Sequence, residues 1–179
     1  MKPVVQEEKT GCGIASSAAI VGLAYEEAKQ IANGMGIYAE DQSLWSYSQY
    51  VRSLLAELGV DTDKEEKPFI SWESLPDCAL ISTKWHREKG KRFWHWAVFV
   101  REGDEQYVLD SKKALRSNIR RDFGRMKPKW YIKVHTWQVV LPDKKFATLA
   151  FSGELGVRQQ ITSSSNRIED GKKRKNNIT

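Results

Sequence analysis

The pattern of apolar and polar positions divides the chain into a helical first part and a second part made of strands. Over residues 11–33 small and apolar residues fall on almost every side of the expected helix, which is typical of a buried helix. Gly34 and Gly36 are placed to end it. Over residues 43–58 leucine and valine recur on one helical face, followed by Gly59 as the residue after the helix. We therefore predict two helices before the strands begin.

Extended segments dominate from residue 79 onward. A charged connector over residues 61–67 ends at Pro68 and separates them from the helices. The predicted strands cover residues 79–85, 95–101, 106–110, 130–141 and 146–151, and the turn Glu102-Gly103-Asp104-Glu105 joins the second and third as a hairpin. Helices followed by a mostly antiparallel sheet predict an α+β fold, with the first helix packed across the sheet.

The length of 179 residues fits one domain. We place this domain at residues 1–161, because residues 162–179 are basic and polar and are expected to be disordered. No apolar run reaches the roughly 18 residues of a membrane span, and no signal peptide is recognisable. We therefore expect a cytoplasmic protein in which the two cysteines, Cys12 and Cys78, are free thiols, although a disulfide between them is arithmetically possible.

The formal net charge of +6 is concentrated in the segment from Lys112 to Lys133. Nine basic residues stand there against the single acid Asp122: Lys112, Lys113, Arg116, Arg120, Arg121, Arg125, Lys127, Lys129 and Lys133. Such a stretch suits an acidic partner or nucleic acid, with the interleaved Phe123, Trp130 and Tyr131 as stacking surfaces. A solvated loop is the alternative interpretation.

Cys12 is the sharpest candidate for chemistry. It stands between Gly11 and Gly13 at the start of the predicted buried helix. The N-terminus of a helix favours the nucleophilic thiolate through its dipole and its unpaired N–H groups. The two glycines carry no side chain that would block a substrate backbone on its way to the sulfur. A small buried cysteine without chemistry is the alternative.

Three further residues complete a hydrolytic set. His95 begins the predicted strand 95–101 and is a candidate general base. Asp110 ends the next strand, and the hairpin returns it beside His95, where its carboxylate would orient the ring. Gln6 lies just upstream of Cys12, and its amide is a candidate second donor for an oxyanion, beside the Cys12 backbone N–H.

With this spacing, Gln6-x5-Cys12-Gly13, then His95 before an apolar strand, then Val108-Leu109-Asp110, the chain resembles the papain-like cysteine peptidases, and most closely the bacterial C39 and C39-like peptidases. The resemblance covers residues 4–111. It implies a papain-like fold, thiol-dependent cleavage of peptide or protein amide bonds, a Cys12-His95-Asp110 triad and Gln6 in the oxyanion hole. Gly11 and Ser111 depart from the family pattern, which often has Asp and Pro at these positions.

The remaining histidines and the second cysteine are weaker candidates for a functional site. His86 is expected to be exposed, His135 lies in an extended run, and Cys78 is expected to be structural. The spacings of a zinc site, a P-loop or a dinucleotide fingerprint do not occur, so we expect no metal and no cofactor. Two alternatives stay open: a glutamine deamidase or acyltransferase with the same triad, and a non-catalytic module that binds through residues 112–133.

Overall fold

The computed structural model describes residues 1–140 and 146–149, with side chains up to residue 135. It contains three α-helices, α1 (Cys12–Val21), α2 (Tyr25–Gly34) and α3 (Gln49–Glu57), and two short 3-10 helices, η1 (Gln42–Ser46) and η2 (Phe123–Arg125). Its strands are β1 (Asp61–Thr62), β2 (Lys67–Pro68), β3 (Cys78–Glu88), β4 (Lys91–Glu102), β5 (Glu105–Leu109), β6 (Ile119–Arg120), β7 (Trp130–Val140) and β8 (Phe146–Leu149). The predicted α+β class is thereby confirmed.

The helix predicted over residues 11–33 is two helices. Gly22 adopts a left-handed conformation (φ 77°) and ends α1, where the prediction had counted it as an interior residue. The backbone N–H of Ala24 donates to the Glu27 carboxylate at 2.8 Å and starts α2. Helix α2 ends at Gly34, as predicted, and Gly36 (φ 76°) turns the chain away.

The helix predicted over residues 43–58 is also interrupted. The 3-10 helix η1 ends at Ser46, Tyr47 is extended, and α3 begins only at Gln49. Asp41 supports the start of η1, because its carboxylate accepts a hydrogen bond from the backbone N–H of Ser43 at 2.8 Å. Gly59, with φ 78°, follows α3 as expected. The spacing of the apolar residues therefore identified the buried face of this segment correctly, but it did not indicate the interruption between η1 and α3.

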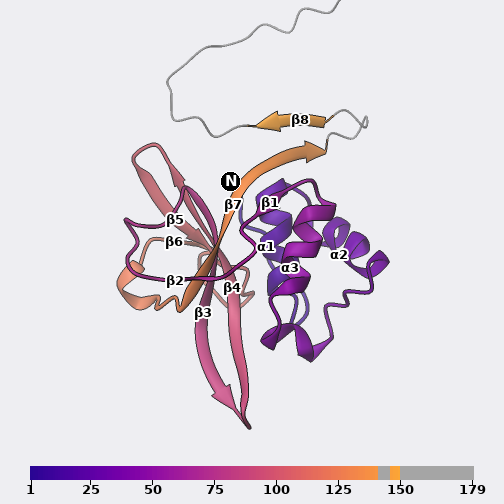
Figure 1. Cartoon of the computed structure of the whole chain (residues 1–179), viewed down its shortest axis with the longest axis horizontal. Coiled ribbons are helices and arrows are strands. Elements are labelled where there is room, and N and C mark those ends of the chain that lie inside the picture. The colour runs from indigo at the N-terminus through magenta and orange to yellow at the C-terminus, as the bar shows by residue number, and fades with distance from the viewer. Residues whose placement is uncertain (141–145, 150–179) are drawn as a thin grey trace, which may run out of the picture.

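The strands form one antiparallel sheet in the order β1-β7-β3-β4-β5-β6, and β2 and β8 also pair with β7. The segment 61–67, predicted as a connector, contributes β1 and the first residue of β2 to this sheet, so that prediction was wrong in part. Figure 1 shows all three α-helices gathered on one side of the sheet. The prediction for residues 150–151 and for the tail 162–179 lies outside the described residues.

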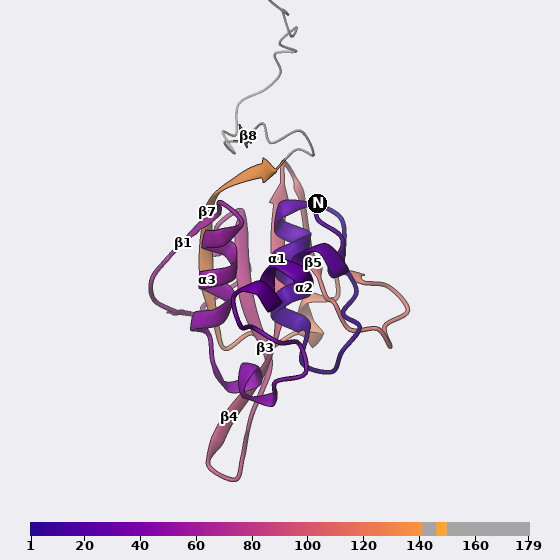
Figure 2. The same cartoon turned by 90° about the vertical axis from the view of Figure 1, so that its right-hand side faces the viewer.

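The hairpin of β3 and β4 is longer than predicted. Both strands continue past the sheet into a two-stranded arm that turns at Lys89 (φ 47°) and Gly90 (φ 80°), and the arm extends beyond the body of the molecule in both views (Figures 1 and 2). His95 therefore lies inside β4, and its predicted position at the start of a strand was wrong. Charged residues occupy the arm on both faces, so the apolar alternation of a half-buried strand is missing there.

Two apolar clusters lie on the two faces of the sheet. The larger one is shared with the helices and includes Cys12, Trp94 and Trp96. The smaller one contains Phe99 and Val108 and is covered by loop residues. Helix α1 is buried along its whole length, as predicted. Among the described residues, no helix is long and apolar enough to cross a membrane.

Candidate active site

Cys12 is the first residue of α1, and the fold buries it with only 2% of its surface exposed. Gly11 precedes it as the N-cap residue and makes no side-chain cap, so the first backbone N–H groups of α1 receive no side-chain acceptor from that position. The backbone N–H of Gly11 donates to the Glu8 carbonyl at 3.2 Å, which closes a tight turn in front of the helix. The thiol thus lies at the positive end of the helix dipole, as predicted.

Packing of the helices, rather than access of a substrate, explains the glycines on either side of Cys12. A β-carbon at Gly11 would lie 1.9 Å from the hydroxyl oxygen of Tyr25, and one at Gly13 would lie 2.1 Å from that of Tyr50. Two tyrosines of α2 and α3 therefore occupy the space that the sequence interpretation had reserved for a substrate. The glycines allow the helices to pack closely around the thiol.

His95 and Asp110 meet as the hairpin register requires. The pairs Glu102↔Glu105 and Val98↔Leu109 bring the residue after β5 back beside the middle of β4. The His95 Nε2 and Asp110 Oδ1 atoms are 2.8 Å apart, in a region where Asp110 is 1% exposed. Since Nε2 is held by the carboxylate, Nδ1 is the ring nitrogen left to exchange a proton with another group.

The electrostatics of the site favour a charged His95. Burial by itself lowers the pKa of His95, but hydrogen bonds with Asp110 and with Cys12, together with the charges of both, outweigh it and raise the pKa to about 9. Burial likewise raises the pKa of Asp110, and the hydrogen bond and charge of His95 reverse this and hold that pKa well below its usual range. The site is thus built to hold an imidazolium beside a carboxylate.

The structure adds partners to Asp110 that the sequence did not indicate. The Arg120 Nη1 donates to Asp110 Oδ2 at 3.1 Å, and the Lys112 backbone N–H donates to Oδ1 at 3.1 Å. The Asn118 side chain donates to the Asp110 carbonyl at 2.7 Å. Arg120 was predicted only as one member of the basic stretch. Its role at Asp110 has no local sequence signal, because the contact depends on the pairing of β6 with β5.

Gln6 lies near the site with its amide engaged. Its Nε2 donates to the carbonyls of Glu8 at 2.9 Å and Lys9 at 3.0 Å. Its Oε1 accepts from the Ser111 hydroxyl at 2.8 Å, and its backbone N–H donates to the Ser111 carbonyl at 2.9 Å. Ser111, noted only as a departure from the family pattern, therefore anchors Gln6 one residue after Asp110. Gln6 and His95 line the same cavity, of about 630 Å³.

The other candidates lie apart from Cys12. His86 is exposed, as predicted, and its ring stacks on Phe93 with centroids 5.5 Å apart. His135 contacts Asp63 and is 40% exposed. Cys78 lies in the core at the start of β3, and burial raises its pKa to about 12. Both cysteines are free, and no group of three or more metal-ligating side chains occurs among the residues the structure describes.

The basic stretch 112–133 is dispersed over several environments. Lys112 and Lys113 line the cavity beside His95, whereas Arg121 pairs with Glu105 at 2.6 Å. The aromatic rings predicted as stacking surfaces pack inward: Phe123 against Trp72, and Trp130 against Trp94. Tyr131 belongs to the cluster on the face opposite the helices.

The chain matches no protein-family model, no curated protein and no solved structure.

Proposed function

We propose that this protein is a cysteine hydrolase of the papain-like, C39-like type that cleaves a peptide or protein amide bond. Cys12 is the nucleophile, His95 carries the proton and Asp110 orients the ring. The observation that supports the proposal best is the His95–Asp110 pair, 2.8 Å apart and mostly buried. Cys12, at the N-terminus of α1, interacts with the same ring and helps to raise its pKa. An α-helix bearing the thiol, packed on an antiparallel sheet bearing the histidine and the carboxylate, fits the same proposal.

The chemistry follows from the positions of the protons. The Cys12 thiolate attacks the carbonyl carbon of the substrate, and the His95 imidazolium gives its Nδ1 proton to the departing amine as the C–N bond breaks. This leaves a thioester and a neutral imidazole. A water molecule then loses a proton to His95 and attacks the thioester, which releases the carboxylic acid and restores the thiolate–imidazolium pair. A glutamine side chain would react in the same way, with ammonia as the leaving group.

The negative charge on the carbonyl oxygen needs donors in both steps. The Cys12 backbone N–H at the start of α1 is the first, and the Gln6 amide is the second. Both Gln6 amide protons are held by the Glu8 and Lys9 carbonyls, so one of these two hydrogen bonds must open when substrate binds. The Ser111 hydroxyl on the other side of the amide keeps Gln6 near the site meanwhile.

The pH dependence of the reaction follows from His95. Acylation uses the imidazolium as the acid, and this form is lost as the pH rises through about 9. We therefore expect turnover to fall above about pH 9. Asp110 stays ionised over the whole working range because its pKa is strongly lowered.

The test is the pH dependence of Cys12 alkylation by iodoacetamide, followed by mass spectrometry of the folded protein. Iodoacetamide is small, which matters for a residue that is 2% exposed. Cys78 is the internal control, because burial raises its pKa to about 12. We expect Cys12 to react rapidly well below the ordinary thiol pKa of about 8.5, and His95→Ala to abolish this advantage.

Three results contradict the proposal. Cys12 labelled no faster than an unperturbed thiol at each pH shows that no thiolate–imidazolium pair forms. Labelling of Cys12 and Cys78 together, only under conditions that unfold the protein, shows that Cys12 is a core residue without access to solvent. A fast reaction that survives His95→Ala assigns the activation to the helix terminus and removes His95 from the mechanism.

A further inference from the structure

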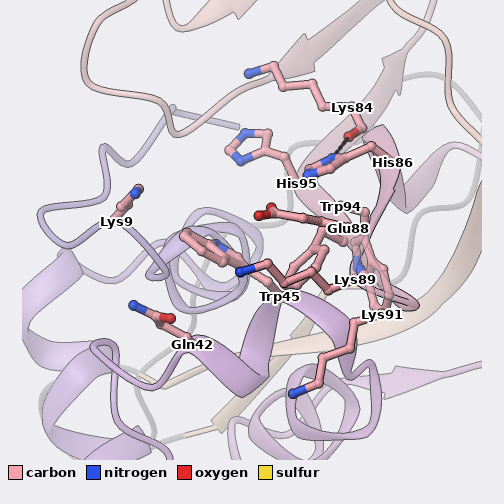
Figure 3. A pocket seen from close by; sticks show the side chains of 11 residues that line it. Lys9, Gln42, Trp45, Lys84, His86, Glu88, Lys89, Lys91, Trp94 and His95 are labelled. Atoms are coloured by element: carbon pink, nitrogen blue, oxygen red, sulfur yellow. Dashed lines mark hydrogen bonds between the residues drawn. The ribbon is translucent and has the colours of Figure 1, made fainter.

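The surface around His95 is one groove with two halves. A cavity of about 530 Å³ on one side and one of about 630 Å³ on the other share Lys9, Lys84, His86 and His95 as lining residues. Each has the volume of a typical ligand pocket. In Figure 3 the strand residues Lys84 and His95 face Lys9 and Trp45 across this space. His95 therefore borders both cavities.

Positive charge dominates the lining of the groove. Six lysines contribute to it: Lys9, Lys84, Lys89, Lys91, Lys112 and Lys113. The carboxylates are Glu7, Glu8 and Glu88, and Glu8 already bonds to Tyr25 and to Lys29. Within the described part of the chain, none of the six ammonium groups lies within ion-pair distance of a carboxylate. The groove thus carries a positive potential that attracts anionic groups.

Lys84, which lines both halves of the groove, lies at an irregularity of the sheet. Thr83 pairs with His95 and His86 pairs with Phe93, so two residues of β3 face one residue of β4, which is a β-bulge. Lys84 takes a left-handed conformation in this bulge, with φ 53°. This region is unfavourable for a residue with a β-carbon, and such positions gather at functional sites. The His86 ring N–H supports the bulge by donating to the Lys84 carbonyl at 3.0 Å.

The bulge turns the Lys84 side chain along His95. Figure 3 shows both side chains extending from the hairpin in the same direction. Burial lowers the pKa of Lys84, the charge of Asp110 opposes this, and the charges of Lys112 and Arg120 add to the lowering. The Lys84 side chain is exposed in the groove, so its ammonium group can reach a bound anion.

One half of the groove also offers an apolar surface. Trp45 and Phe93 meet edge to face with centroids 6.1 Å apart, and Trp94 completes this side. Among the described residues, no tryptophan, tyrosine or phenylalanine lines the other half, which carries Lys112 and Lys113 together with Glu7 and Glu8. The two halves therefore differ in chemistry on either side of His95.

On the basis of the proposed hydrolase activity, we propose that the groove selects peptides with an acidic side chain on one side of the scissile bond and a large apolar side chain on the other. The acidic side chain lies in the half with Lys112 and Lys113 and pairs with Lys84, and the apolar one lies against Trp45 and Phe93. Lys84 is a specificity-determining residue in this arrangement. Lysines line both halves, and a polyanion is a weaker fit because it would leave the apolar surface of Trp45 and Phe93 uncovered.

The test uses quenched-fluorescence decapeptides with the whole chain. Each pair of peptides has a leucine on one side of the central bond and either glutamate or glutamine on the other. We expect kcat/KM to be at least tenfold higher for the glutamate peptide, with the preference falling as salt is raised. Lys84→Met should reduce the preference about tenfold, and Lys84→Glu should reverse it. Lys127→Met, a change of an exposed lysine outside the groove, should leave the preference unchanged.

A binding measurement separates this inference from the hydrolase proposal. Anisotropy of the same labelled peptides on Cys12→Ser reports the preference without turnover. If no peptide is cut and the glutamate peptide still binds more tightly, the proposed hydrolase activity is refuted and the inferred preference for acidic peptides is supported. Equal cleavage or binding of both peptides, or a preference unaffected by Lys84→Met, overturns the inference. A short oligonucleotide that binds more tightly than the glutamate peptide, in a Lys84-dependent manner, overturns it in favour of nucleic acid.

Discussion

Asp110→Asn provides the sharpest test of the electrostatics of the site. The change keeps the shape of the side chain and removes the charge that lies 2.8 Å from His95. The pKa of His95 is raised from 6.5 to about 9 against the effect of burial. At about 1.4 kcal/mol per unit, this gap corresponds to about 3 kcal/mol of interaction with the charged ring. Because Cys12 supplies part of the effect, we expect the substitution to remove about 2 kcal/mol and to lower the His95 pKa from about 9 to about 7.5.

The same gap predicts how the stability of the protein depends on pH. A group whose pKa is higher in the folded than in the unfolded state stabilises fully below its unfolded pKa, and this contribution is lost as the pH rises through the folded value. For His95 the loss falls between pH 6.5 and about 9. The wild type should therefore lose about 3 kcal/mol of its unfolding free energy from this group in that window, and Asp110→Asn should lose much less.

The assay follows the ring nitrogens of ¹⁵N-labelled histidine by NMR as the pH is raised. The chain has only three histidines, so His86→Gln and His135→Gln assign the signals by elimination. Denaturant unfolding at pH 6 and pH 9 measures the stability. Asp63→Asn is the matched control: it removes the carboxylate beside His135, whose side chain is 40% exposed, and an exposed pair contributes little.

Two observations would refute this reasoning. One is a wild-type His95 that titrates near 6.5, which means that the carboxylate does not hold its proton. The other is an Asp110→Asn variant whose His95 still titrates near 9, which assigns the raised pKa to some other group. In the first case the wild type would show no alkaline loss of stability from His95, and in the second both proteins would lose the same amount.

The packing around the nucleophile leads to three further expectations, all measurable by denaturant unfolding. Gly11→Ala should destabilise by about 1–3 kcal/mol through overpacking, and Tyr25→Phe in the same chain should recover most of this, because only the hydroxyl lies closer than 3.0 Å. Gly13→Ala should be as costly without such a rescue, because ring carbons of the tyrosine facing it also lie at 2.6 and 2.7 Å. Ser111→Ala should destabilise the protein by about 1–3 kcal/mol, because it leaves the buried Gln6 amide oxygen without its donor. Turnover should fall as well. Stability and turnover like those of the wild type would argue against an anchoring role.

The contact of His95 with Asp110 was predictable because short-range rules determine it. The turn Glu102-Gly103-Asp104-Glu105 joins the predicted strands 95–101 and 106–110, and a hairpin of known turn fixes the register of every later pair. Glu102 pairs with Glu105, and the ladder then brings residue 110 back toward residue 95 without further assumptions. The helical start of Cys12 was predictable for a similar reason, since a glycine before a run of small apolar residues is a local signal.

Arg120 and Ser111 could not be found in this way. Arg120 reaches Asp110 because the two-residue strand β6 pairs with β5, and two residues are too few for an alternating pattern to emerge from a basic segment. Ser111 anchors Gln6 across 105 positions of the chain. No residue near either of them in the sequence indicates this contact. Long-range partners of this kind follow from the tertiary fold.

For the glycines beside Cys12 and for the lysine beside His95, the residue type alone does not reveal the role that the residue has in the fold. A glycine in the sequence shows that a side chain is absent, but it does not show which group approaches the free space. At Gly11 the Tyr25 hydroxyl, and not a substrate, occupies that space. Lys84 looks like any surface lysine in the sequence, and only the register shift between Thr83 and His86 gives it a left-handed backbone beside the site. The space around Cys12 is therefore smaller, and the cavities beside His95 are more positive, than the sequence indicated. The positive lining beside His95 favours a substrate that is steered in by its own negative charge.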